Sequence, residues 1–205
     1  MPVSWDDART AFTDAAEWFV HTTALVGNRW REPGLGEWDV RALVGHTSRA
    51  LLTVETYLAR PATAVEVASA TDYYRTTRTA AAGAAVAARG RDAGAALGAD
   101  PAAAVADIAT RVLALLRTLE GTELVTTISG GMRLSDYLPT RTFELTVHTA
   151  DLATALDVPL HVPAKAAAQA LGLVAELAVA GDLAGPLLLA ATGRRPGLPA
   201  GFSVL

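Results

Sequence analysis

Cysteine is absent from the 205-residue chain, which excludes disulfides, thiolate metal ligands and a cysteine nucleophile. An excess of positive charge is also missing, because 17 Lys and Arg residues stand against 21 Asp and Glu and give a net charge of -4. A chain without a basic stripe cannot neutralise successive phosphates. We therefore do not expect nucleic acid as a partner.

Long apolar runs are lacking as well. No segment approaches the roughly 20 uninterrupted apolar residues that a membrane-spanning helix needs, because Arg, Asp and Gly interrupt the Ala-rich stretches. The chain begins Met-Pro-Val-Ser-Trp-Asp-Asp, which is polar and acidic and so indicates no export signal. We expect a cytoplasmic protein that has no membrane segment.

What the sequence does contain is enough apolar material for a full core, since 51% of its residues are hydrophobic. Apolar positions recur at helical spacing, and Ser4, Asp39 and Asp100 are typical helix N-caps. The pattern predicts an all-α fold with helices over about 4–26, 39–59, 71–98, 101–119, 140–157, 164–179 and 183–191. We interpret residues 1–205 as one helical-bundle domain, with an irregular tail at about 192–205.

The remaining segments are predicted to be loops, with at most one small β-hairpin. Residues 27–36 carry Asn, Pro and glycines and predict a loop. Residues 122–134 are β-prone around Gly130-Gly131 and predict a short hairpin. The 71–98 segment has no bulky apolar residue after Tyr74, so it predicts a surface helix that could break near Gly90.

The helix expected over 140–157 separates its polar residues into two groups. We expect solvent to cover one face, which carries Thr142, Thr146, Thr149 and Asp157. The second group lies between two apolar flanks and so points to the interior: Arg141, Glu144, His148 and Asp151. Burying such groups is costly unless they are paired or bind a metal.

The inward group suggests a metal site. Glu144 and His148 are four residues apart, with side-chain roots about 5–6 Å apart, so both could reach one zinc ion at roughly 2.0–2.2 Å. His46 lies at the edge of an apolar arc on the 39–59 helix and is the candidate third ligand, because helical bundles build core metal sites from facing helices. The same residues also allow a structural salt-bridge network of Arg141, Glu144, His148 and Asp151. Spacing alone does not separate the two.

Other candidate site residues have weaker support. Trp38 precedes the second helix and could pack its entry against the core or contact a ligand. Tyr57 shares the side of His46 and could line a cleft. We interpret His21 and His161 as structural or exposed residues rather than ligands.

Two segments, Glu37-Trp-Asp-Val-Arg-Ala-Leu-Val-Gly-His46 and Arg141-Thr-Phe-Glu-Leu-Thr-Val-His-Thr-Ala-Asp-Leu-Ala153, resemble the N-terminal, DinB-like metal-binding domain of mycothiol-dependent maleylpyruvate isomerases. The tail from Thr192 to Phe202 is similar to the ending of short members of that group. The resemblance implies a DinB-like four-helix bundle whose metal, usually zinc, is held by His46, Glu144 and His148. It also implies mycothiol, an actinobacterial thiol, as cosubstrate.

Little sequence follows Ala191, so we expect a short member without the separate C-terminal domain, and we carry over the metal ligands but not the substrate. Three protein ligands leave a fourth position open, as in catalytic zinc sites. The resulting hypothesis is a metal-bound thiolate that attacks an electrophilic small molecule, giving S-transfer or isomerisation. Arg141 could orient Glu144 or hold an anionic substrate, and Asp151 could fix the tautomer of His148.

Two other functions stay open. A metal-dependent hydrolase would use bound water in place of the thiol. A non-catalytic metal- or ligand-binding helical module would show no turnover with any thiol. The sequence is compatible with a monomer or a homodimer in each case.

Overall fold

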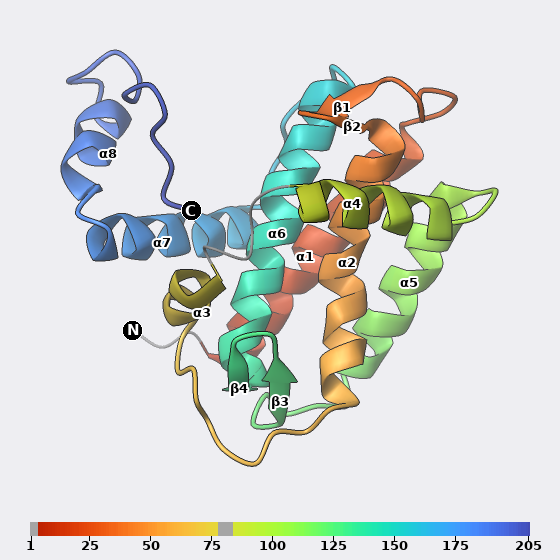
Figure 1. Cartoon of the computed structure of the whole chain (residues 1–205), viewed down its shortest axis with the longest axis horizontal. Helices are drawn as coiled ribbons and strands as arrows, with labels where there is room; N and C mark the ends of the chain where they lie inside the picture. The colour runs from red at the N-terminus through yellow and green to blue at the C-terminus, as the bar shows by residue number, and fades with distance from the viewer. Residues whose placement is uncertain (1–3, 78–83) are drawn as a thin grey trace.

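The computed structural model describes residues 4–77 and 84–205, and its framework is a bundle of four long helices (Figure 1). These are α1 (Trp5–Ala24), α2 (Val40–Leu58), α5 (Pro101–Leu116) and α6 (Leu134–Ala155). Both α5 and α6 contact α1 and α2, which closes the bundle around a shared apolar core. The predicted all-α fold is confirmed.

Helix starts follow the predicted caps. The side chains of Ser4, Asp39 and Asp100 each accept a hydrogen bond from the backbone N–H three residues further on, at 2.8 to 3.1 Å. Such a bond satisfies one of the donors that the first helical turn leaves free. The starts of α1, α2 and α5 are therefore fixed by local sequence.

Helix α6 begins at Leu134, and the predicted start at residue 140 is wrong. Pro139 lies inside this helix, although proline lacks an N–H and usually ends a helix. Its neighbours Leu138 and Thr140 are nevertheless fully buried, one on each side of the proline. Packing of this turn outweighs the one missing hydrogen bond. The helix ends before Asp157, whose φ of 51° turns the chain away.

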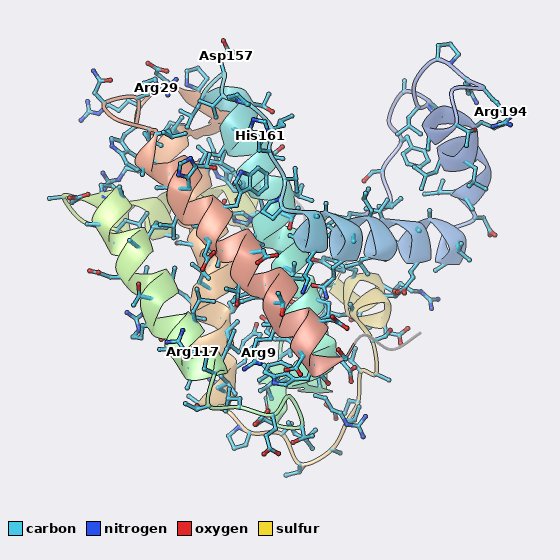
Figure 2. All side chains as sticks on the ribbon, turned by 180° about the vertical axis from the view of Figure 1, so that it is seen from behind. Arg9, Arg29, Arg117, Asp157, His161 and Arg194 are labelled. Carbon is cyan, nitrogen blue, oxygen red and sulfur yellow. The ribbon has the colours of Figure 1, made fainter. Side chains whose placement is uncertain are left out.

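The expectation that solvent covers the threonine face of α6 is also wrong. Thr142, Thr146 and Thr149 are buried, because α1 and α7 both pack against α6. The hydroxyls of Thr142 and Thr146 donate to carbonyls one turn earlier, at 3.3 and 2.7 Å. Since the helix itself satisfies these groups, they enter the core at low cost. Asp157 alone of the four lies at the surface, as Figure 2 shows.

The 71–98 segment holds two helices, α3 (Ala70–Thr77) and α4 (Ala84–Ala96), and residues 78–83 lie outside the described part. Helix α4 continues through Gly90, so the expected break is wrong. It packs across α2 (Figure 1), while residues on its outer side, such as Arg89 and Arg91, are exposed, as expected of a surface helix. Gly90 and Gly94 are buried, and a Cβ on Gly45 of α2 would overlap the backbone of Gly94. Glycine, not a bulky apolar stripe, makes this contact.

The predicted hairpin is present as β3 (Leu124–Thr127) and β4 (Gly130–Arg133), paired antiparallel. A second, shorter pair was not predicted: β1 (Pro33–Leu35) and β2 (Trp38–Asp39) lie around the expected loop. The glycines and the proline of this segment are typical of a turn, which is why the sequence predicted a loop. The pair leads directly into α2 and places Trp38 at the start of that helix.

The C-terminal part leaves the bundle. Helix α7 (Ala164–Ala180) packs against α6 and α1 near its start, whereas α8 (Ala184–Ala191) stands away from the four long helices (Figure 1). No residue of α8 is buried, and Arg194 marks the far end of this arm in Figure 2. Across residues 4–77 and 84–205, no helix has the length and apolar content to cross a lipid bilayer.

Candidate metal centre

Packing of α2 on α6 brings one imidazole next to a carboxylate–imidazole pair. His46 lies in the second turn of α2, and Glu144 and His148 lie one turn apart on α6. One potential ligand atom from each of the three side chains lies within 4.8 Å of the other two. Within the α6 pair, His148 Nε2 is 3.3 Å from Glu144 Oε2. These three residues are the cluster that the sequence singled out.

His46 is a half-buried, neutral imidazole. Burial, together with the charge of His148, lowers its pKa from 6.5 to about 4, although the charge of Glu144 acts in the opposite direction. Its Nδ1 atom is buried and has no hydrogen-bond partner among the described residues. Unpartnered buried nitrogens are uncommon, and each one calls for a ligand, a water or an ion.

Glu144 and His148 form the charged half of the cluster. Burial opposes the charge on Glu144, but the hydrogen bond from His148 and the charge of Arg141 outweigh it and lower its pKa to about 2. Burial also opposes the charge on His148, yet hydrogen bonds to Asp151 and Glu144 raise its pKa to about 9. Without a metal, His148 is therefore protonated at neutral pH. The structural salt bridge considered for this group exists in that state between His148 and its two carboxylates.

Asp151 lies where the sequence placed it, one turn beyond His148. Its Oδ2 atom is 3.0 Å from His148 Nδ1 and accepts the proton of that nitrogen. This contact leaves Nε2 as the atom that faces Glu144 and His46. A carboxylate behind a ligand histidine is the usual arrangement in metal sites.

The donor set fits a divalent cation. Two imidazoles and one carboxylate are typical of catalytic zinc sites. Bonds of roughly 2.0–2.2 Å at a tetrahedral angle would place two donors about 3.3–3.6 Å apart. The 3.3 Å between His148 Nε2 and Glu144 Oε2 matches such an edge. His46 supplies a third donor, because one of its ring nitrogens lies within 4.8 Å of a ligand atom of Glu144 and of His148.

Tyr74 of α3 contacts the cluster and was missed by the sequence analysis. Its hydroxyl donates to Glu144 Oε1 at 2.6 Å and also lies 3.1 Å from the carbonyl of Thr140. Burial raises the pKa of Tyr74 well above its usual value, so the hydroxyl is a donor at neutral pH. The two residues are 70 positions apart, and no spacing in the sequence connects them.

Arg141 is buried beneath tyrosine rings. Its guanidinium carbon lies 5.5 Å from the ring centre of Tyr73 and 5.0 Å from that of Tyr137. Its Nε donates to Thr140 Oγ1 at 2.9 Å, and within the described part of the chain no carboxylate pairs with it directly. The contacts are cation–π and electrostatic. Arg141 therefore acts on Glu144 through its charge.

The remaining candidates separate into one near the cluster and three away from it. The ring centre of Trp38 is 4.5 Å from that of His46, and its indole N–H donates to the carbonyl of Ala87 at 3.0 Å. Tyr57 is in the core against Tyr137, about 16 Å along the helix from His46. His21 and His161 are exposed, and Figure 2 shows His161 at the surface between α6 and α7.

Residues 21–153 match the family described as the mycothiol maleylpyruvate isomerase N-terminal domain. The match covers more than half of the chain. The chain belongs to this family. The matched segment contains His46, Tyr74, Glu144 and His148, whereas α7 and α8 lie beyond it. No curated protein and no solved structure matches the chain. The resemblance inferred from the two sequence segments is confirmed, and with it a DinB-like, mycothiol-related domain.

Proposed function

We propose that this domain holds a divalent cation, zinc, with His46, Glu144 and His148 and uses it to activate a small thiol, mycothiol. The observation that supports the proposal is the cluster of two imidazoles and one carboxylate within 4.8 Å, inside the segment that matches the family. The activated thiol attacks an electrophilic small molecule, with S-transfer or isomerisation as the result.

When bound, such a cation supplies thiolate at neutral pH, because coordination deprotonates a thiol whose free pKa is about 8.5. Among the described residues, three side chains are available as ligands, and three protein ligands are the pattern of catalytic rather than structural zinc sites. The side chains of His148 and Glu144 are 17% and 23% exposed, so a small molecule can reach the cluster from solvent.

The surrounding residues have separate tasks. Asp151 holds the proton on His148 Nδ1 and so keeps Nε2 free as a donor. Trp38 stacks against His46 and fixes the orientation of its ring. Arg141 keeps Glu144 ionised from beneath the tyrosine rings. We assign Arg141 to support of the carboxylate and not to substrate contact, because its guanidinium is buried.

The test combines metal analysis with a thiol assay. The freshly purified chain is expected to contain about one equivalent of zinc per chain, the occupancy of a single structural or catalytic site. It should consume electrophiles only when mycothiol is present, and chelation should abolish that activity. A chain that binds no divalent metal would refute the proposal. Turnover that does not need the thiol would instead identify a hydrolase using water.

The role of Arg141 has its own test. Arg141→Lys keeps a positive charge but loses the planar group that stacks between the two rings. If Arg141 supports the carboxylate, this variant should bind zinc more weakly. Retained zinc affinity with reduced turnover would instead show that Arg141 contacts the substrate.

A further inference from the structure

The two oxygens of Glu144 have different partners. Oε1 accepts the Tyr74 hydroxyl at 2.6 Å, a length typical of a hydrogen bond to a charged carboxylate. Oε2 faces His148 Nε2 at 3.3 Å. One oxygen is therefore engaged by the protein, and the other is directed at the cluster.

The Tyr74 hydroxyl has one proton and two acceptors within reach. The carbonyl of Thr140 is 3.1 Å away, whereas the carboxylate oxygen is 2.6 Å away and carries charge. The shorter, charge-assisted bond takes the proton. Tyr74 therefore acts on Glu144 rather than on the α6 backbone.

The position of the hydroxyl is fixed by the packing of the ring that carries it. Only 8% of the Tyr74 surface is exposed. Its ring centre lies 5.5 Å from that of Tyr73 and 5.4 Å from that of Phe143. Both contacts are edge-to-face, which is a favoured aromatic arrangement. The ring cannot follow a carboxylate that rotates.

Helix α3 is itself held in place at its start and on its side. The Ser69 hydroxyl accepts the N–H of Asp72 at 3.0 Å, and the Thr71 hydroxyl donates to Glu176 of α7 at 2.7 Å. The donor to Glu144 thus comes from a helix that is braced against a neighbour outside the metal cluster.

We infer that Tyr74 is a positioning residue: by bonding to Oε1 of Glu144, it leaves only Oε2 to bind the cation. This inference rests on the proposed metal function. A carboxylate that offers both oxygens would occupy a further position on the cation, and the thiol needs that position. Tyr74 in this way preserves a site for the second reactant without touching it.

The test uses Tyr74→Phe, which keeps the ring and removes the hydroxyl. Zinc affinity is measured by chelator competition, and the visible spectrum of the cobalt-substituted chain reports the number and geometry of ligands. We expect zinc affinity to fall about tenfold, within the range for loss of a group that orients a ligand. We also expect weaker cobalt bands, as the carboxylate binds through both oxygens.

Tyr137→Phe is the matched control. It removes another buried tyrosine hydroxyl, which donates to Thr53 at 3.0 Å and does not contact Glu144. This variant should keep both the zinc affinity and the cobalt spectrum of the unmodified chain. A purely structural role for tyrosine hydroxyls would change the two variants alike and would overturn the inference.

Phe143→Leu provides a second variant that leaves the Tyr74 hydroxyl in place but loosens its ring. It should change the cobalt spectrum in the same direction as Tyr74→Phe, by a smaller amount. If the unmodified chain binds zinc and a folded Tyr74→Phe variant has the same affinity and spectrum, the inference is wrong although the metal function stands. If the unmodified chain binds no metal, the metal function itself fails.

Discussion

The interface of α2 and α6 buries charged side chains, whereas the α7–α8 arm exposes large apolar ones. Between α2 and α6, the charged Arg141 and Glu144 lie in or beside the core, and each has a compensating neighbour. In the arm, large apolar side chains face solvent: Leu171 and Val179 are both 67% exposed and Leu188 is 63% exposed. The family match includes the first region and ends before the second.

The difference shows that apolar content does not by itself tell where the folding free energy comes from. Leu173 and Leu177 of α7 are buried in the core, but no residue of α8 is buried. The exposed leucines of the arm therefore contribute little to folding of the single chain. In the α2–α6 region the charged Arg141 and Glu144 are tolerated because each has a compensating neighbour. Three pairs of matched variants and one change of pH test this contrast.

The largest contrast should be between two leucines. Leu152 in α6 is fully buried, and Leu152→Ala is expected to lower the free energy of unfolding by about 2–5 kcal/mol. Leu188 in α8 is 63% exposed, and Leu188→Ala should change that free energy by less than about 0.5 kcal/mol. Urea unfolding measures both. A large loss for Leu188→Ala would mean that the apolar side of α8 is covered in solution.

The second contrast is between two histidines. His46→Ala removes a proposed ligand from the cluster and should weaken zinc binding at least about 100-fold, or about 2.8 kcal/mol. His21→Ala removes an exposed imidazole from α1 and should leave zinc binding unchanged. Chelator competition gives both affinities. Zinc retained at full affinity by His46→Ala would show that the cation is held elsewhere.

The third contrast is between two glycines in helices. A Cβ on Gly45 would overlap the backbone of α4, so Gly45→Ala should destabilise the fold by about 1–3 kcal/mol. Gly172 in α7 has open space around it, and Gly172→Ala should stabilise the chain by up to about 1 kcal/mol through helix propensity. Both effects are read from denaturant unfolding curves. Stabilisation by Gly45→Ala would contradict the tight α2–α4 contact.

The last test changes the pH and leaves the sequence unchanged. The pKa of His148 is raised from 6.5 to about 9 in the metal-free chain, so a cation must displace its proton. Zinc affinity should rise about tenfold, or 1.4 kcal/mol, for each pH unit between 6.5 and 9. The folding stability of the metal-free chain depends on pH in the opposite direction. The contribution of protonated His148 to that stability is complete below pH 6.5 and is lost as the pH rises through 9.

Calorimetry in buffers of different ionisation enthalpy gives the number of protons released on zinc binding. About one proton per zinc is expected at pH 7, because His148 is then protonated before the ion binds. Zinc binding without proton release at that pH would contradict the ion pairs of His148 with Glu144 and Asp151.

The features that sequence could predict are those fixed within a few residues. The caps at Ser4, Asp39 and Asp100 and the β3–β4 hairpin depend on local side-chain chemistry, and they are present. The i, i+4 spacing of Glu144 and His148 likewise sets their proximity once α6 forms. The approach of His46 needed the further assumption that two apolar arcs pack together.

The features that sequence did not predict depend on what surrounds an element. The α6 threonines looked like a solvent face, but α1 and α7 pack against α6, and the hydroxyls of Thr142 and Thr146 bond within the helix. The importance of Tyr74 depends on where α3 lies relative to Glu144, and no periodic pattern carries that information. Helix α4 lacked an apolar stripe because its contact with α2 is made by backbone at Gly94.

The glycine crossing of α2 and α4 lies immediately beside the cluster, because Gly45 and His46 are consecutive residues. Helix α4 also supplies the Ala87 carbonyl that holds the Trp38 indole, and Gly90 leaves the room in which that indole lies. The distance between α2 and α4 therefore affects the position of the His46 ring, because Trp38 contacts both α4 and that ring. Any enlargement at the crossing would shift Trp38 and, with it, the ring of His46. The tolerance of the cluster to mutation is therefore set partly by residues that are not ligands.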